Sequence, residues 1–119
     1  MHHCINCGGS LEVTKVACPT CRLSFAGQLQ LPRLARLTPD EQALAERILL
    51  AGGNLKQVAG DLEISYPTLR KRVDGMIAAL EALRRSDDKR CEELLGAVEA
   101  GSISPEEAAR VMKELNGGI

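Results

Sequence analysis

Aromatic residues and long apolar runs are the two things this sequence has least of. Its 119 residues include one Phe, one Tyr and no Trp, so any core must be built from Leu, Ile, Val and Ala, a composition that favours helix. No apolar run reaches the roughly 18 residues of a membrane-spanning helix. The N-terminal MHHCINC also lacks the charged-then-apolar order of a secretory signal. We therefore expect a mainly α-helical protein of the cytoplasm.

The residues that usually build catalytic sites are scarce as well. The only histidines, His2 and His3, are adjacent at the N-terminus, so no Ser/His/Asp or Cys/His arrangement can be assembled around them. Gly52-Gly53 is placed to end a helix, whereas a phosphate-binding loop follows a strand. We expect no enzymatic activity.

Charge is distributed unevenly along the chain. The net charge is −1, but residues 1–39 carry four basic and one acidic side chain, residues 40–86 seven of each, and residues 87–119 four basic and eight acidic. Such a gradient is typical of a nucleic-acid face at one end and a partner face at the other, or of a merely solvated acidic surface.

Cysteine, in contrast, is concentrated at the N-terminus. Two C-x-x-C pairs lie between residues 4 and 21, and two such turns supply the four thiolates that a tetrahedral zinc ion accepts. The β-rich runs Leu11–Val16 and Leu23–Leu31 complete the pattern of a zinc ribbon over residues 1–31. Disulfides are disfavoured in the cytoplasm, and a redox C-x-x-C motif would accompany a βαβ pattern. Structural Zn²⁺ would stabilise a segment too small to bury a core. The predicted ligands are Cys4, Cys7, Cys18 and Cys21.

The middle of the chain carries helix start and stop signals. Thr38-Pro39-Asp40-Glu41 predicts a helix that starts with a capping box. That helix is expected to place Leu44, Ile48 and Leu49 on one face and to end at Gly52-Gly53.

Two further helices are predicted after this point. Asn54 is a suitable N-cap for a short helix, and Ser65 for a third helix. The third helix has an a/d stripe that either packs on the chain's own first helix or joins two copies in a homodimer, which would present two recognition helices one DNA turn apart. The stripe consists of Leu69, Val73, Met76, Leu80 and Leu83.

Residues 54–73, NLKQVAGDLEISYPTLRKRV, resemble the helix-turn-helix of the Fis-like class of bacterial DNA-binding proteins. Glu63 stands where that class usually has Gly in the turn. A non-Gly residue can adopt the required backbone conformation at some energetic cost.

A physical argument for DNA contact stands beside this resemblance. If Leu69 and Val73 face the core, the side chains around them in the first two turns project outward, where a recognition helix enters the major groove. Arg side chains can read guanine, while Lys and hydroxyl groups hold phosphates. The alternatives are a solvated basic helix face or a protein-binding helix-turn-helix. The predicted DNA-binding residues are Lys56, Tyr66, Thr68, Arg70, Lys71 and Arg72.

The C-terminal residues 87–119 are predicted to form a helical hairpin. Ser86-Asp87-Asp88 has the composition of a helix start, and Gly101 is expected to end that helix. Ser104–Glu107 has the pattern of a capping box and is expected to start the next helix. Cys91 is expected to be a small apolar residue of the first of these helices. The stretch GSISPEEA at residues 101–108 resembles the SHOCT class of C-terminal modules, which implies interaction or oligomerisation. A hairpin of this size buries little alone, so we expect it to dock on the long helix, on a second copy or on a different protein.

Over residues 4–85 the order of zinc ribbon, the phrase LPRLARL and helix-turn-helix resembles a family of small, functionally uncharacterised bacterial zinc-ribbon/helix-turn-helix proteins. We expect three domains, residues 1–31, 32–86 and 87–119, in a mainly α protein with a small β ribbon. The resemblance implies a DNA-binding transcriptional regulator, which we expect to be dimeric. The alternative is an adaptor that binds a protein of the transcription machinery, or another protein partner, through ribbon and hairpin.

Overall fold

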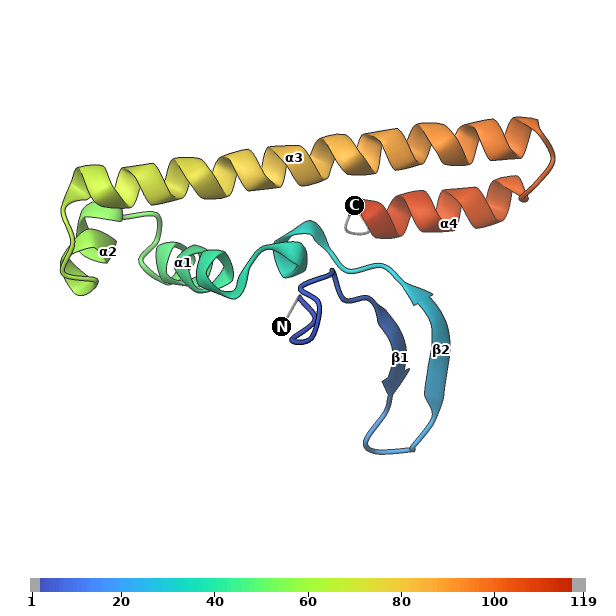
Figure 1. The fold of residues 1–119 in the computed structure, drawn as a ribbon, viewed down its shortest axis with the longest axis horizontal. Helices are drawn as coiled ribbons and strands as arrows, with labels where there is room; N and C mark the ends of the chain where they lie inside the picture. Colours follow the sequence, from blue (N-terminus) through green and yellow to red (C-terminus); the bar gives the residue numbers. More distant parts are fainter. Residues whose placement is uncertain (1–2, 117–119) are drawn as a thin grey trace. The chain divides into compact units, whose positions relative to one another are not determined.

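The computed structural model describes residues 3–116, which form a two-stranded antiparallel sheet, a short 3-10 helix and four α-helices (Figure 1). The chain divides into two compact units: Arg33–Glu92, and Met1–Pro32 together with Glu93–Ile119. A mainly helical chain with a small β element at its N-terminus confirms the coarse fold prediction. Among the described residues, no helix combines the length and the apolar character needed to cross a membrane.

The β element consists of β1 (Val13–Ala17) and β2 (Ser24–Leu29), which pair from Val13↔Leu29 to Ala17↔Ser24. A bulge in this ladder places one extra residue on β2 near Gly27, whose φ is +151°. Almost every side chain of the two strands is exposed, so the sheet has no hydrophobic core of its own.

The Arg33–Glu92 unit begins with the 3-10 helix η1 (Arg33–Arg36) and α1 (Pro39–Leu50). Thr38 caps α1 as predicted: the Glu41 backbone N–H donates to the Thr38 hydroxyl at 3.3 Å, and the Thr38 N–H donates to the Glu41 carboxylate at 3.1 Å. This capping box satisfies two donors that would otherwise have no partner at the helix start.

The core of this unit joins α1, α2 (Leu55–Asp61) and the first half of α3 (Tyr66–Glu99). The prediction that Leu49 shares the core face of α1 is wrong, because its side chain is 74% exposed. The α3 stripe does pack inward, since Leu69 and Met76 are 0% and 8% exposed. The buried core residues are Leu44, Val58, Ala59, Leu69 and Val73.

The turn between α2 and α3 has the backbone that the resemblance required. Glu63 has φ of +55°, and the Ile64 and Glu63 N–H groups donate to the carbonyls of Ala59 and Gly60, both at 3.1 Å. Gly52 has the equivalent position after α1, with φ of +63°. Glu63 therefore holds a left-handed conformation that is costly for a residue with a Cβ atom.

α3 is one continuous helix of 34 residues, so the predicted helix start at Ser86 is wrong. Asp87 does not cap a helix; its side chain is buried, and it accepts hydrogen bonds from Arg33 and Arg36. With these partners the carboxylate does not compete for backbone N–H groups, and the helix continues through it.

The predicted C-terminal hairpin is present in the unit that contains Glu93–Ile119. α3 ends before Gly101, which has φ of +77°, and α4 (Pro105–Leu115) starts after Ser104, whose hydroxyl accepts from the Glu107 N–H at 3.2 Å. The buried residues of this hairpin are Leu94, Ala108 and Leu115.

Candidate functional site

The start of α3 is held by its N-cap residue. The Ser65 hydroxyl accepts from the Thr68 backbone N–H at 3.3 Å and lies 2.8 Å from the Thr68 hydroxyl. Asn54 caps α2 in the same way, accepting from the Gln57 N–H at 3.2 Å. Both predicted caps are confirmed. The Thr68 hydroxyl is thereby engaged at the cap, although its side chain is exposed.

The six predicted DNA-contact residues do not share one face of the helix-turn-helix. An α-helix turns by about 100° per residue, so with Leu69 and Val73 in the core, Arg70 and Lys71 face outward. Arg72 falls instead beside Met76, on the flank of α3 that adjoins α1. Lys56 is exposed in the first turn of α2, and Tyr66 is 45% exposed at the first position of α3.

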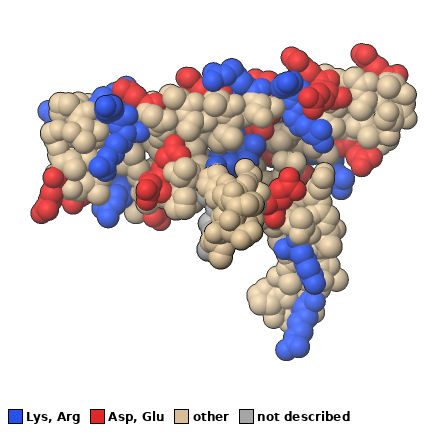
Figure 2. Space-filling model, viewed as in Figure 1, with Lys and Arg blue, Asp and Glu red and all other residues tan. Residues whose placement is uncertain are grey.

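Arg70, which is predicted to contact a DNA base, forms an ion pair with Asp74 on the same helix. Its Nε lies 3.3 Å from an Asp74 carboxylate oxygen, and both side chains are more than half exposed. An exposed pair of this kind stabilises a helix by only about 0.3–0.5 kcal/mol, so Arg70 can leave it at little cost. Figure 2 shows Lys and Arg side chains gathered where α2 and the start of α3 lie, with acidic side chains beside them.

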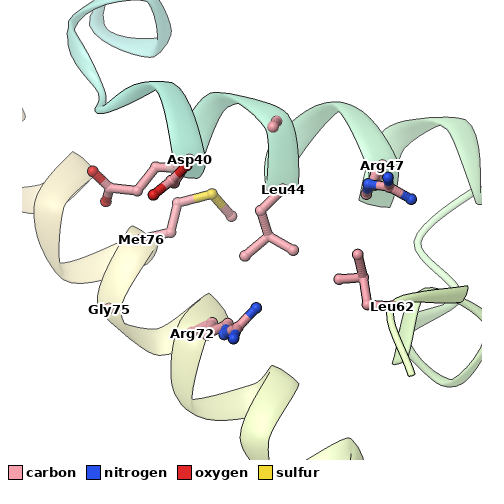
Figure 3. A pocket seen from close by; sticks show the side chains of 9 residues that line it. Asp40, Leu44, Arg47, Leu62, Arg72, Gly75 and Met76 are labelled. Atoms are coloured by element: carbon pink, nitrogen blue, oxygen red, sulfur yellow. The ribbon is translucent and has the colours of Figure 1, made fainter. Parts of the chain in front are cut away.

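Arg72 lines a groove of about 720 Å³ between α1 and α3. Figure 3 shows its guanidinium extending from α3 toward Leu44 and Leu62, with Arg47 of α1 on the opposite wall. Sequence reasoning missed Arg47. Arg47 could have been found from its position between Leu44 and Ile48 in the sequence, because this position puts its side chain at the edge of the core-facing stripe of α1.

The Arg33–Glu92 unit also contains an ion-pair cluster that the sequence analysis did not anticipate. Arg33 Nε donates to Asp87 Oδ2 at 2.8 Å, and Arg36 donates from Nη1 to Oδ1 at 2.9 Å and from Nη2 to Oδ2 at 2.6 Å. Burial by itself would raise the pKa of Asp87, but the hydrogen bonds and charges of Arg36, then of Arg33, outweigh it and hold this pKa below its usual value. The cluster joins η1 to the middle of α3.

The two C-x-x-C turns have the same local geometry. In each turn the N–H of the first Cys donates to the carbonyl five residues later, and its carbonyl accepts from the N–H four residues later, all at 2.8 Å. The fourth residue after the first Cys has positive φ in both cases: Gly8 at +72° and Arg22 at +64°. Repeated turns of this kind each present a pair of thiols on one short loop.

Backbone amides point at the first sulfur of each turn. The Asn6 N–H lies 3.4 Å from Cys4 Sγ, and hydrogen bonds from the Cys7 and Asn6 backbone lower the pKa of Cys4. The Cys21 and Thr20 backbone lowers the pKa of Cys18 in the same way. Thiolate is the form that binds metal, so the donor set fits zinc chemistry.

Residues 3–116 contain no group of three or more Cys, His, Asp or Glu side chains gathered closely enough to hold a metal. The prediction of one four-thiolate zinc site therefore stays a prediction.

The helix-turn-helix segment can be compared with known families. Residues 37–83 match a family model described as "Domain of unknown function (DUF2089)-HTH". The match begins before α1 and ends within α3, so it contains the whole three-helix core. It confirms the predicted helix-turn-helix and its link to an uncharacterised family over this segment. No curated protein and no solved structure matches the chain.

Proposed function

We propose that this protein is a sequence-specific DNA-binding transcriptional regulator. The observation that carries the proposal is the helix-turn-helix: the segment that matches the family model packs α1, α2 and α3 around one core. The first two turns of α3 leave basic side chains exposed on the side opposite that core. A helix held in this way is the element that such domains place in the major groove.

The proposed contacts divide by chemistry. Arg70 is proposed to read a base edge, because a guanidinium can bind guanine through two hydrogen bonds. Lys71 and Lys56 are proposed to bind phosphates, which fixes the position of the domain on the duplex. Tyr66 and Thr68 would contact the backbone or base edges beside them, and Arg72 would reach a phosphate from the flank of α3.

We further propose that Cys4, Cys7, Cys18 and Cys21 hold a structural zinc ion. The support is the repeated turn geometry, the lowered pKa of Cys4 and Cys18, and a β element without a core. Four thiolates would close the coordination shell, so the ion would stabilise the fold and leave no open position for catalysis.

The test of DNA binding uses the zinc-loaded protein and fragmented DNA from its own host. Retained fragments are sequenced at two salt concentrations, because non-specific binding to phosphates falls steeply with salt. We expect a few sites to stay enriched at the higher salt. Retention that is absent, or uniform and abolished by salt, would contradict the proposal.

A paired variant sharpens this test. Arg70→Ala/Lys71→Ala should weaken binding to an enriched site at least tenfold, since one good bidentate contact contributes about 1–3 kcal/mol of discrimination. Arg84→Ala/Arg85→Ala is the matched control, because these two arginines are exposed on the same helix beyond its first two turns.

The second candidate function is a protein-interaction adaptor. It is favoured by Leu49 and Leu50 of α1, which are 74% and 82% exposed, since neighbouring exposed leucines are typical of interaction surfaces. In an adaptor, Leu49→Gln/Leu50→Gln would abolish binding of the partner protein, whereas Arg70→Ala/Lys71→Ala would leave that binding unchanged.

A further inference from the structure

The groove between α1 and α3 combines an apolar floor with one arginine from each of the two helices. Leu44 of α1, Leu62 at the end of α2 and Met76 of α3 line its floor. Arg47 and Arg72 line it from opposite helices (Figure 3). Its volume of about 720 Å³ lies within the range of roughly 300–1,000 Å³ that is typical of small-molecule sites.

Neither of these guanidinium groups has a partner within the part of the chain that the structure describes. Asp87 binds Arg33 and Arg36, and Asp74 binds Arg70, but no carboxylate among residues 3–116 pairs with Arg47 or Arg72. Two arginines without partners beside an apolar surface favour an anion that carries an apolar body.

The acidic residues of the groove lie at its other end. Figure 3 places Asp40 beside Met76, away from Arg47. Glu41 is already engaged, because its carboxylate accepts hydrogen bonds from the Thr38 N–H and hydroxyl. The groove thus has one cationic and one acidic end, which orients a ligand with a single negative charge.

Gly75 is the residue of the groove that has no side chain. It lines the groove, and a Cβ atom added at this position would meet no heavy atom within 4 Å. A larger side chain here would start in open space beside the groove, and we expect it to narrow the groove.

We propose that the groove between α1 and α3 binds a small amphipathic carboxylate, with the carboxylate paired to Arg47 and Arg72 and the apolar part on Leu44, Leu62 and Met76. This site goes beyond DNA binding and shares one residue, Arg72, with the proposed DNA contacts. Each carboxylate oxygen can accept from a guanidinium, and a hydrocarbon chain of several carbons covers the floor.

The test measures binding of octanoate to the full zinc-loaded chain by calorimetry and by backbone amide NMR shifts. We expect a dissociation constant on the order of 0.1–1 mM, the range for a ligand of about ten heavy atoms. Octanamide, which has the same chain without the charge, should bind at least tenfold more weakly. Equal binding of the two probes, no binding of octanoate, or shifts confined to residues outside the groove would overturn the proposal.

Two sets of variants localise the site. Arg47→Gln/Arg72→Gln should weaken octanoate binding about tenfold or more, whereas Arg84→Gln/Arg85→Gln should not change it. Gly75→Leu should abolish binding while the protein keeps its thermal stability. Gly96→Leu is the matched control, because Gly96 also has open space around it on α3 but does not line the groove. Retained binding in Gly75→Leu would sink the proposal even if the arginine variant failed to fold.

Discussion

Arg36 and Asp87, which are 51 residues apart in the sequence, form a bidentate ion pair with hydrogen bonds of 2.9 and 2.6 Å. Arg33 adds a third hydrogen bond at 2.8 Å. Only 3% of Asp87 is exposed, so its charge depends on these two partners. The cluster ties η1, the residues just before the helix-turn-helix, to the middle of the long helix.

Asp87→Asn is expected to destabilise the protein by about 3 kcal/mol, because removing one partner from a buried pair leaves the others uncompensated. The free energy of unfolding, measured in urea, checks this. Asp88→Asn is the control, since Asp88 is exposed on the same turn of α3 and should change stability by less than about 0.5 kcal/mol. Equal effects of the two changes would show that the cluster contributes nothing specific.

The same cluster predicts a dependence of stability on acid. The folded-state pKa of Asp87 is lowered from 3.8, so its contribution is fully present above that value and is lost as pH falls through the lowered pKa of the folded state. Unfolding free energies of the wild type and Asp87→Asn should therefore converge in strong acid and differ most near neutral pH. A difference that stays constant down to strong acid would contradict this reasoning.

Glu63→Gly is expected to stabilise the protein by about 1 kcal/mol, because Gly adopts the φ of +55° without the cost of a Cβ atom. This corresponds to a rise in melting temperature of about 5 °C for a unit of this size. The reciprocal change Gly52→Ala, at φ of +63°, should lower the melting temperature. A fall with Glu63→Gly would mean that the glutamate side chain stabilises the turn through another contact.

Zinc is expected to bind with a stoichiometry of one per chain and to protect residues 1–32 from proteolysis, since the sheet has no core to hold it closed. Metal analysis, the absorption spectrum of the Co²⁺-substituted protein and limited digestion measure this. Cys7→Ser or Cys21→Ser should abolish the protection, whereas Cys91→Ser should leave it unchanged. Two metals per chain would instead indicate that the two turns bind separately.

A homodimer remains a prediction, and the structure restricts the surface available to it. Leu69 and Met76 are buried within the protomer, so these members of the α3 stripe cannot join two copies. Leu49 and Leu50 are exposed on α1, and Leu49→Gln/Leu50→Gln should turn a dimer into a monomer in sedimentation equilibrium. A dimer that survives this change would place the interface elsewhere.

Local signals in the sequence were reliable where one short segment decides the conformation. Thr38, Asn54, Ser65 and Ser104 cap helices as predicted, because each cap is a hydrogen bond made within three residues. The strands, the turn at Glu63 and the hairpin follow from similarly short-range chemistry. The two C-x-x-C motifs likewise predicted turns that each present two thiols, because their spacing is local.

Tertiary structure decided what depends on distant partners. Ser86-Asp87-Asp88 has the composition of a helix start, yet Asp87 is buried in mid-helix because two arginines 51 and 54 residues away neutralise it. Leu49 is apolar but exposed, because it lies about 100° around α1 from Ile48 and so turns away from the face that packs into the core. The sequence by itself thus determined the caps of α1 to α4 and the helix-turn-helix, but not the continuity of α3 through Asp87. Only the tertiary structure placed Arg72 in a groove with Arg47, because two residues 25 positions apart meet only when their helices pack.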